Sequence, residues 1–140
     1  GRPGRFSDPG SRDYLGPMIP IELYRAIHLI AIMLLFISFG GLAMVVAAGG
    51  SRESNPNRKL LAALHGTAAF LVLLGGFGML ARLGLVSGFP GWVWLKLLLW
   101  LVLTFLVLLP YRRPALAKPL FLLYPVLGGV AAWSAIVKPF

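Results

Sequence analysis

The sequence predicts an all-α fold: an integral membrane four-helix bundle whose antiparallel helices run up-down-up-down. Three observations predict it. Apolar residues make up 59% of the chain and charged residues 12%, whereas a soluble domain carries about 25% charged residues. Four apolar runs are each long enough to cross a bilayer. The segments that join these runs are short, and short connections make neighbouring helices antiparallel.

The chain divides into a polar tail and a membrane domain. Residues 1–20 are rich in Gly, Pro, Arg and Ser and have no periodicity, which is typical of a flexible tail. Residues 21–140 form the transmembrane domain. Its helices are expected at about 21–50, 60–82, 92–110 and 119–138.

A turn separates the first two apolar runs. The first run, residues 26–50, carries no formal charge and is long enough to span a bilayer with some tilt. The segment Asn55-Pro56-Asn57 predicts the turn. The second run, residues 60–81, ends at Arg82, and glycines and a proline then break the chain.

The last two apolar runs are separated by a basic loop. Residues 92–110 are apolar except for Lys96, and the loop 111–118 carries two arginines and a lysine. Residues 119–137 are close to the minimum length of a spanning helix, and Lys138 follows them.

Lys and Arg in the short loops predict the orientation. The first and third loops carry three each, whereas the second carries only Arg82, with Lys96 just inside the next helix. Such an excess marks cytoplasmic loops. We therefore expect both termini outside, in a bacterial cytoplasmic membrane. The arginines of the tail favour the opposite orientation; they are Arg2, Arg5 and Arg12.

The scarcity of acids and the lack of cysteine exclude several kinds of site. The chain has four acids, none after Glu53, and no cysteine. Di-iron, calcium and magnesium sites in a bundle need carboxylates, and disulfides and thiolate metal sites need cysteine. The net charge of +9 comes from cations beside the apolar runs. We therefore expect membrane lipids and other membrane protein subunits as partners, and no nucleic acid.

Two histidines inside the apolar runs are candidate functional residues. His28 lies about two turns into the first run, and His65 about a turn and a half into the second. Ionisable residues at such positions are functional candidates, although a neutral histidine bonded to a backbone carbonyl is the more ordinary role. Because antiparallel helices enter from opposite faces, the two levels differ by about 15–20 Å. The two histidines therefore cannot ligate one haem or one metal ion.

Glycines and a methionine are expected opposite each histidine. Glycine lets a flat macrocycle approach the backbone, and His and Met are haem ligands. The pattern is thus a candidate tetrapyrrole site, with haem as the cofactor to test, although small residues also allow close helix packing and Met also fills gaps. The facing residues are Gly75, Gly76 and Met79 for His28, and Gly40, Gly41 and Met44 for His65.

Lys96 lies between two tryptophans on one helix face, at four residues from each. Its ammonium can reach the interface and lie over the indoles of Trp92 and Trp100. The alternative is an anionic partner, such as a lipid headgroup, a quinone oxygen or a haem propionate. Four cations share this predicted surface and form a candidate anion or lipid site: Arg25, Arg82, Lys96 and Lys138.

Two segments carry a resemblance to a known family. Tyr24–Phe36, Y-R-A-I-H-L-I-A-I-M-L-L-F, and Trp92–Leu97, W-V-W-L-K-L, resemble conserved segments of the HemJ-type protoporphyrinogen oxidases and related small four-helix membrane proteins. The resemblance implies a haem-ligand role for His28 and gives Lys96 the place of that family's lysine. The chain lacks the family's Pro-Arg pair and has other residues where the family has Trp and His, namely Leu35 and Trp94.

These observations favour a small non-catalytic membrane subunit of a larger complex, which we expect to be energy-transducing by analogy with other small accessory bundles. No nucleophile–base pair is visible, since neither histidine has an acid nearby. The alternative is a haem-binding membrane oxidoreductase of the HemJ-like kind. A transporter or channel ranks third, because the sequence has no broken helix pair with a charged lining.

Overall fold

The computed structural model describes residues 19–140, and the predicted tail lies outside this part apart from its last two residues. No strand occurs between residues 19 and 140, so the all-α prediction is confirmed. The elements follow one another as α1 Ile21–Ala47, α2 Arg58–Arg82, α3 Gly91–Phe105, the 3₁₀ segment η2 Leu106–Leu108, α4 Leu109–Arg112, the 3₁₀ segment η3 Pro114–Leu116 and α5 Ala117–Val137.

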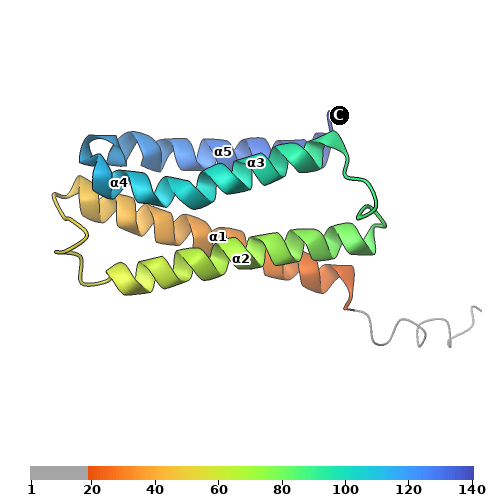
Figure 1. Ribbon diagram of the computed structural model, residues 1–140, viewed down its shortest axis with the longest axis horizontal. Coiled ribbons are helices and arrows are strands. Elements are labelled where there is room, and N and C mark those ends of the chain that lie inside the picture. The colour runs from red at the N-terminus through yellow and green to blue at the C-terminus, as the bar shows by residue number, and fades with distance from the viewer. Residues whose placement is uncertain (1–18) are drawn as a thin grey trace, which may run out of the picture.

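These elements make four long helical spans. The third span joins α3, η2 and α4 without a gap, and the fourth joins η3 and α5. All four spans are long and apolar enough to cross a membrane, as the sequence predicted. Figure 1 shows that they lie along the long axis of the molecule and that the chain reverses direction at each connection.

The first loop begins and ends earlier than the sequence suggested. α1 ends at Ala47, because Gly49 takes a left-handed conformation with φ of 96° and Gly50 N–H donates to the Val45 carbonyl at 2.9 Å. This closure is a familiar way to end a helix at glycine. α2 then begins at Arg58, directly after the predicted turn.

Pro110 explains why the third span is not one continuous α-helix. Proline has no N–H to donate to the carbonyl four residues before it, and its ring clashes with that carbonyl. The affected carbonyl belongs to Leu106, where the chain tightens into the 3₁₀ segment η2. The helix resumes at Leu109, so the sequence predicted the span but not its interruption.

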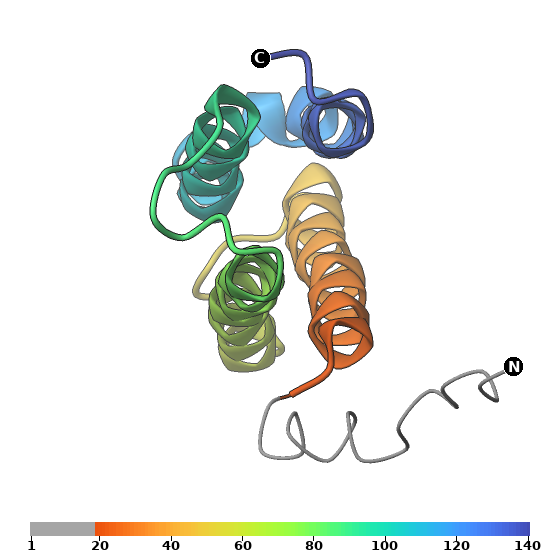
Figure 2. The same ribbon diagram turned by 90° about the vertical axis from the view of Figure 1, so that its right-hand side faces the viewer.

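α1 and α2 form the most closely packed pair. A Cβ added at Gly75 would lie 2.9 Å from the Cβ of His28, and one at Gly78 would overlap the ring of Tyr24. Only glycine therefore lets the two backbones approach this far. Figure 2 shows this pair beside the second pair, α3 and α5, when the molecule is seen end-on.

Stacked aromatic rings hold α1 against α5. The rings of Phe39 and Tyr124 are nearly parallel, with centroids 4.0 Å apart, and each side chain is 1% exposed. Ala69 of α2 and Leu103 of α3 belong to the same buried cluster. The core thus joins all four spans at this level.

Four aromatic side chains tie neighbouring helices together by donating hydrogen bonds to main-chain carbonyls. A carbonyl oxygen has a second lone pair, so it can accept such a bond besides its helical partner. The bonds are His28 Nδ1–H to Val72 at 2.8 Å, His65 Nε2–H to Thr104 at 2.9 Å, Trp100 Nε1–H to Ala69 at 2.9 Å, and Tyr124 O–H to Leu103 at 3.1 Å.

Candidate ligand site

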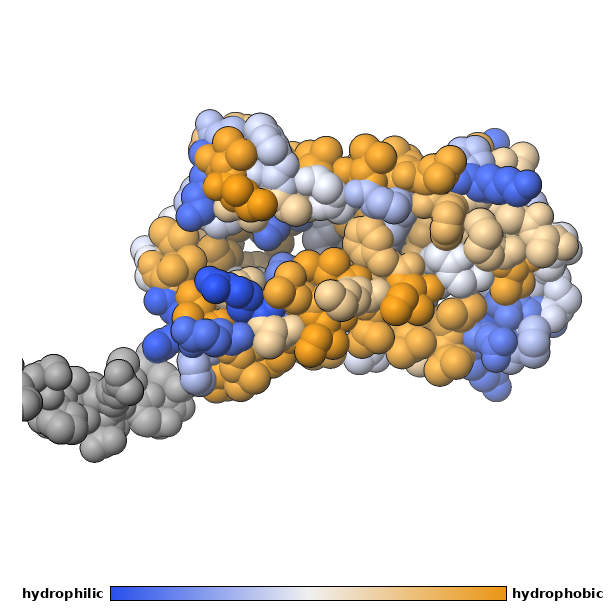
Figure 3. Space-filling view, turned by 180° about the vertical axis from the view of Figure 1, so that it is seen from behind, coloured by the Kyte–Doolittle hydropathy of each residue, from blue (hydrophilic) through white to orange (hydrophobic). Residues whose placement is uncertain are grey.

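A cavity of about 420 Å³ lies between the two helix pairs, and residues of all four spans line it. It occupies the end of the molecule where α1 begins and where the second loop and the end of α5 lie. In Figure 3 the face is hollowed near its left end, and both hydrophilic and hydrophobic side chains border the hollow. The rest of that face is mostly hydrophobic. The cavity is therefore a recess with a partly polar rim in an apolar surface.

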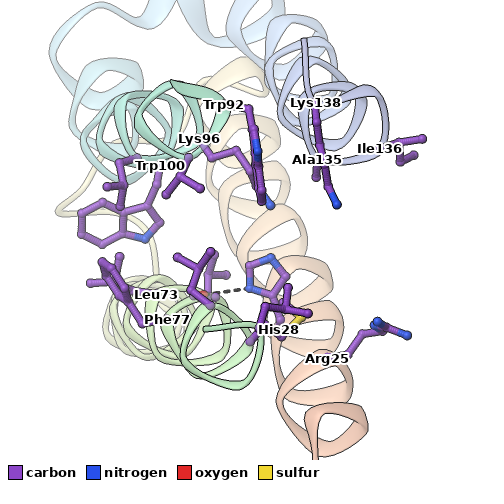
Figure 4. A pocket seen from close by; sticks show the side chains of 17 residues that line it. Arg25, His28, Leu73, Phe77, Trp92, Lys96, Trp100, Ala135, Ile136 and Lys138 are labelled. Atoms are coloured by element: carbon purple, nitrogen blue, oxygen red, sulfur yellow. Dashed lines mark hydrogen bonds between the residues drawn. The ribbon is translucent and has the colours of Figure 1, made fainter. Parts of the chain in front are cut away.

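His28 forms part of the wall of this cavity. Its Nδ1–H donates to the Val72 carbonyl of α2, so the proton is on Nδ1 and the Nε2 lone pair is unshared. Figure 4 shows the Nε2 side of the ring turned away from Val72 and towards Trp92. The imidazole is thus held in one orientation and presents an acceptor to the cavity.

Three of the four predicted cations line the cavity, and they come from different spans. They are Arg25 of α1, Lys96 of α3 and Lys138 directly after α5. Figure 4 shows Arg25 at the same edge of the cavity as Ile136 and Lys138. The fourth predicted cation, Arg82, does not line the cavity and has an interaction of its own.

The opposite side of the cavity is aromatic and apolar. Trp100, Leu73 and Phe77 stand there, across from the cationic edge (Figure 4). The indole N–H of Trp100 is already used in its bond to the Ala69 carbonyl. This end of the cavity therefore offers ring faces and aliphatic carbon to a ligand.

A cation over Trp92 comes from a different helix than the sequence indicated. The structure places Lys138 Nζ 5.6 Å from the centre of the Trp92 ring, within cation–π range. Trp92 N–H also donates to the Phe140 carbonyl at 3.0 Å, so the end of α5 is joined to the start of α3. Sequence spacing relates residues on one helix, and it carries no signal for this pair.

Met79 lines the cavity together with His28, but the two belong to the same wall. α1 and α2 approach so closely beside them that no macrocycle passes between these helices. Gly76, the third predicted member of the group, has its Cβ position 3.5 Å from His28 Cε1, an ordinary contact distance. His28, Gly76 and Met79 thus line the same cavity, whereas Gly75 lies in the contact between α1 and α2.

His65 lines neither of the two cavities, and its expected neighbours line the second one. It is 5% exposed, and its Nε2–H donates to the Thr104 carbonyl of α3. Met44, with Gly40 and Gly41, instead lines an apolar recess of about 500 Å³ that α1 and α5 enclose. The His65 ring turns towards α3, whereas Met44 lines the recess beside α5.

The predicted packing glycines lie at contacts between helices. Added Cβ atoms at Gly40 and Gly41 would lie 3.3 Å from the side chains of Phe121 and Leu61 respectively. These contacts are tight but yield to a small side-chain shift, whereas Gly75 faces the backbone of His28 at 3.0 Å. The closest constraint in the group is therefore at Gly75.

Within residues 19–140 no group of three or more His, Cys, Asp or Glu side chains could hold a metal ion. Chemically, the cavity combines fixed positive charge, one histidine acceptor and an apolar aromatic wall, which suits an amphipathic anion. Comparisons of the chain with models of known families, with curated proteins and with solved structures found no significant match.

Proposed function

We propose that the chain is a small integral membrane subunit without catalytic residues of its own, which holds an amphipathic ligand between its helix pairs. The observation that carries this proposal is that Arg25, Lys96 and Lys138 line the same largely apolar cavity as the His28 acceptor. Convergent polar groups in a largely apolar cavity are the usual mark of a ligand site.

The outer surface supports the membrane part of the proposal. Large apolar side chains lie exposed on every span, for example Met33 at 63%, Phe70 at 61%, Leu98 at 58% and Ile136 at 81%. Water would penalise such a surface, whereas lipid chains solvate it. The bacterial cytoplasmic membrane, with the first and third loops inside, is the location that we propose from the charges of these loops.

Three polar side chains inside the spans bond to main-chain carbonyls, which supports the non-catalytic part. His65 is bonded to Thr104, and the hydroxyls of Ser38 and Ser134 bond carbonyls of their own helices at 2.9 and 2.8 Å. No described residue pairs a nucleophile with a base, as covalent catalysis would require. The exposed Gly66 offers a partner helix a close approach, since nothing lies within 4 Å of its Cβ position.

Two measurements on native membranes test this proposal. Alkaline carbonate should leave the chain in the pellet, because its spans lie in the bilayer. Native electrophoresis after mild solubilisation should place it in a particle far heavier than its own 15.2 kDa. Release by carbonate would overturn the membrane assignment, and migration as a lone chain in its micelle would overturn the subunit assignment.

A haem-binding oxidoreductase of the HemJ-like kind is the second candidate, and His28 favours it. Histidines that ligate iron commonly donate the other ring N–H to a backbone carbonyl, which is the arrangement of His28 and Val72. The residues fit a macrocycle ligated on one face: His28 would hold the iron, the cations would hold the propionates, and Trp100 would pack on the ring. A bound haem supplies one-electron redox chemistry.

Absorbance of the purified protein separates the two candidates. A porphyrin gives strong bands in the region of about 380–600 nm. A band that disappears in His28→Ala and persists in His65→Ala would establish the haem reading at this cavity. A featureless spectrum from protein purified from its native membrane would leave the subunit reading.

A further inference from the structure

We propose that the amphipathic ligand of the cavity is an acidic phospholipid, whose phosphate lies among Arg25, Lys96 and Lys138 and whose acyl chains leave along the apolar surface. This inference rests on the proposed membrane location and names the ligand that the proposed function left general. Three features of the cavity support it: the level of its cations in the membrane, its excess of positive charge and the direction in which it opens.

The depth of the cations matches that of a lipid headgroup. α1 has 27 residues and is about 40 Å long, whereas the hydrocarbon core is about 30 Å thick. Its first residues therefore lie at headgroup level. Arg25 is about 6 Å from the start of α1, and Lys96 about 8 Å from the start of α3, so their long side chains can reach the headgroup level. Lys138 follows the last residue of α5 at the same end.

Among the described residues, three cations and no carboxylate line the cavity. Among residues 19–140, neither Arg25 nor Lys96 forms an ion pair with a carboxylate, and Lys138 is paired only with the ring of Trp92. Lys96 is half-buried, where an ammonium without a counter-ion is costly. A phosphate monoanion supplies the missing charge and accepts charge-assisted hydrogen bonds from Arg and Lys.

The opening of the cavity favours a lipid over a soluble anion. The hollow in Figure 3 lies on the side of the molecule, and hydrophobic atoms form part of its border. Ile136, which stands at its cationic edge, is 81% exposed. An acyl chain would cover such atoms while its headgroup remains between the cations. Free phosphate would leave them bare and would gain nothing from them.

Lipid-dependent thermal stability tests the inference on the whole chain in a neutral detergent. The probes are phosphatidylglycerol, phosphatidylcholine and inorganic phosphate. The variants are Lys96→Gln and Arg25→Gln, and the matched control is Lys118→Gln, an exposed cation at the opposite end of α5. Mass spectrometry of the purified chains counts the acidic lipid that each retains.

The expected result is a rise in Tm with phosphatidylglycerol, a smaller rise with phosphatidylcholine and none with phosphate. Each cavity substitution should weaken phosphatidylglycerol binding about fivefold, and Lys118→Gln should leave it unchanged. Equal responses of Lys96→Gln, Arg25→Gln and Lys118→Gln would overturn the site. A rise in Tm with phosphate alone would show that the cavity binds a soluble anion. A haem absorbance band would show that it binds a porphyrin. Either result would overturn the lipid proposal. Arg25 is exposed, so its variant serves if Lys96→Gln does not fold. None of these outcomes alters the carbonate or electrophoresis results.

Discussion

His28 is fastened to α2 through Val72: its Nδ1–H donates to the Val72 carbonyl oxygen at 2.8 Å. One bond thus joins two helices, fixes the tautomer of the ring and directs Nε2 to the cavity. The structural role of this histidine is therefore coupled to the ligand-binding role that we propose for it, and a substitution removes both.

Replacement of His28 by alanine should lower the free energy of unfolding and remove the imidazole ring that lines one side of the cavity. The lost bond should cost about 0.6 kcal/mol, with an upper value of about 1.7, as for other side-chain bonds between membrane helices. Unfolding in a graded detergent mixture measures this change. His28→Asn keeps a side-chain donor, and it should recover part of the loss without restoring a ring acceptor. Equal losses in both variants would show that packing, and not the bond, is responsible.

His65→Ala should have a purely structural effect. The ring donates to the Thr104 carbonyl, and its Nδ1 is buried without a partner among the described residues. We expect a loss of about 0.6 kcal/mol and no change in any absorbance band. The same unfolding and absorbance measurements check it, and loss of a porphyrin band in this variant would contradict the assignment of the ligand site to His28.

Gly75→Ala should separate α1 from α2. The added methyl group would meet the Cβ of His28 at 2.9 Å and its backbone at 3.0 Å, which requires a shift of one helix. Such overpacking costs about 1–3 kcal/mol. Gly66→Ala, on the open side of the same helix, is the control and should stay within about 1 kcal/mol of the parent. Equal stability of the two variants would mean that the helices adjust without strain.

Cysteine labelling in intact cells should reveal the side on which each loop lies. Glu53 and Ser87 are exposed in the first and second loops, and Ala115 is exposed in η3, at the connection between the third and fourth spans. Because the first and third loops are the more basic, Glu53→Cys and Ala115→Cys should resist an impermeant thiol reagent, and Ser87→Cys should react. The reverse pattern would invert the orientation, and reaction at only one of the first two positions would contradict the four-span arrangement.

The sequence predicted the spans because length and apolarity decide them locally. It also predicted that Arg25, Lys96 and Lys138 share one end, since antiparallel order follows from the short loops. It did not predict the direction of each side chain around its helix. His65 turns to α3 and Met44 to α5, and these rotations depend on packing that a single apolar run does not encode.

Contacts between segments that are distant along the chain could not be predicted from the sequence either. Asn55 of the first loop donates to the Tyr111 hydroxyl at 2.9 Å, and Lys138 lies over Trp92. Each contact joins residues that are far apart along the chain and whose types are common in loops and at helix ends. Pro110, by contrast, was visible in the sequence, and its effect on the third span follows from its missing N–H.

In the hydrogen bonds between helices, the position that supplies the side-chain donor should tolerate few substitutions, whereas the position that supplies the main-chain carbonyl should tolerate many. The donors are specific side chains, such as Trp100 and Tyr124, whereas the acceptors at Ala69 and Leu103 are atoms that every amino acid possesses. A saturation scan should therefore find the donor positions restricted to residues that carry an N–H or O–H of similar reach. The acceptor positions should tolerate any apolar residue of fitting size. Substitutions there would leave the hydrogen bond between the two helices intact.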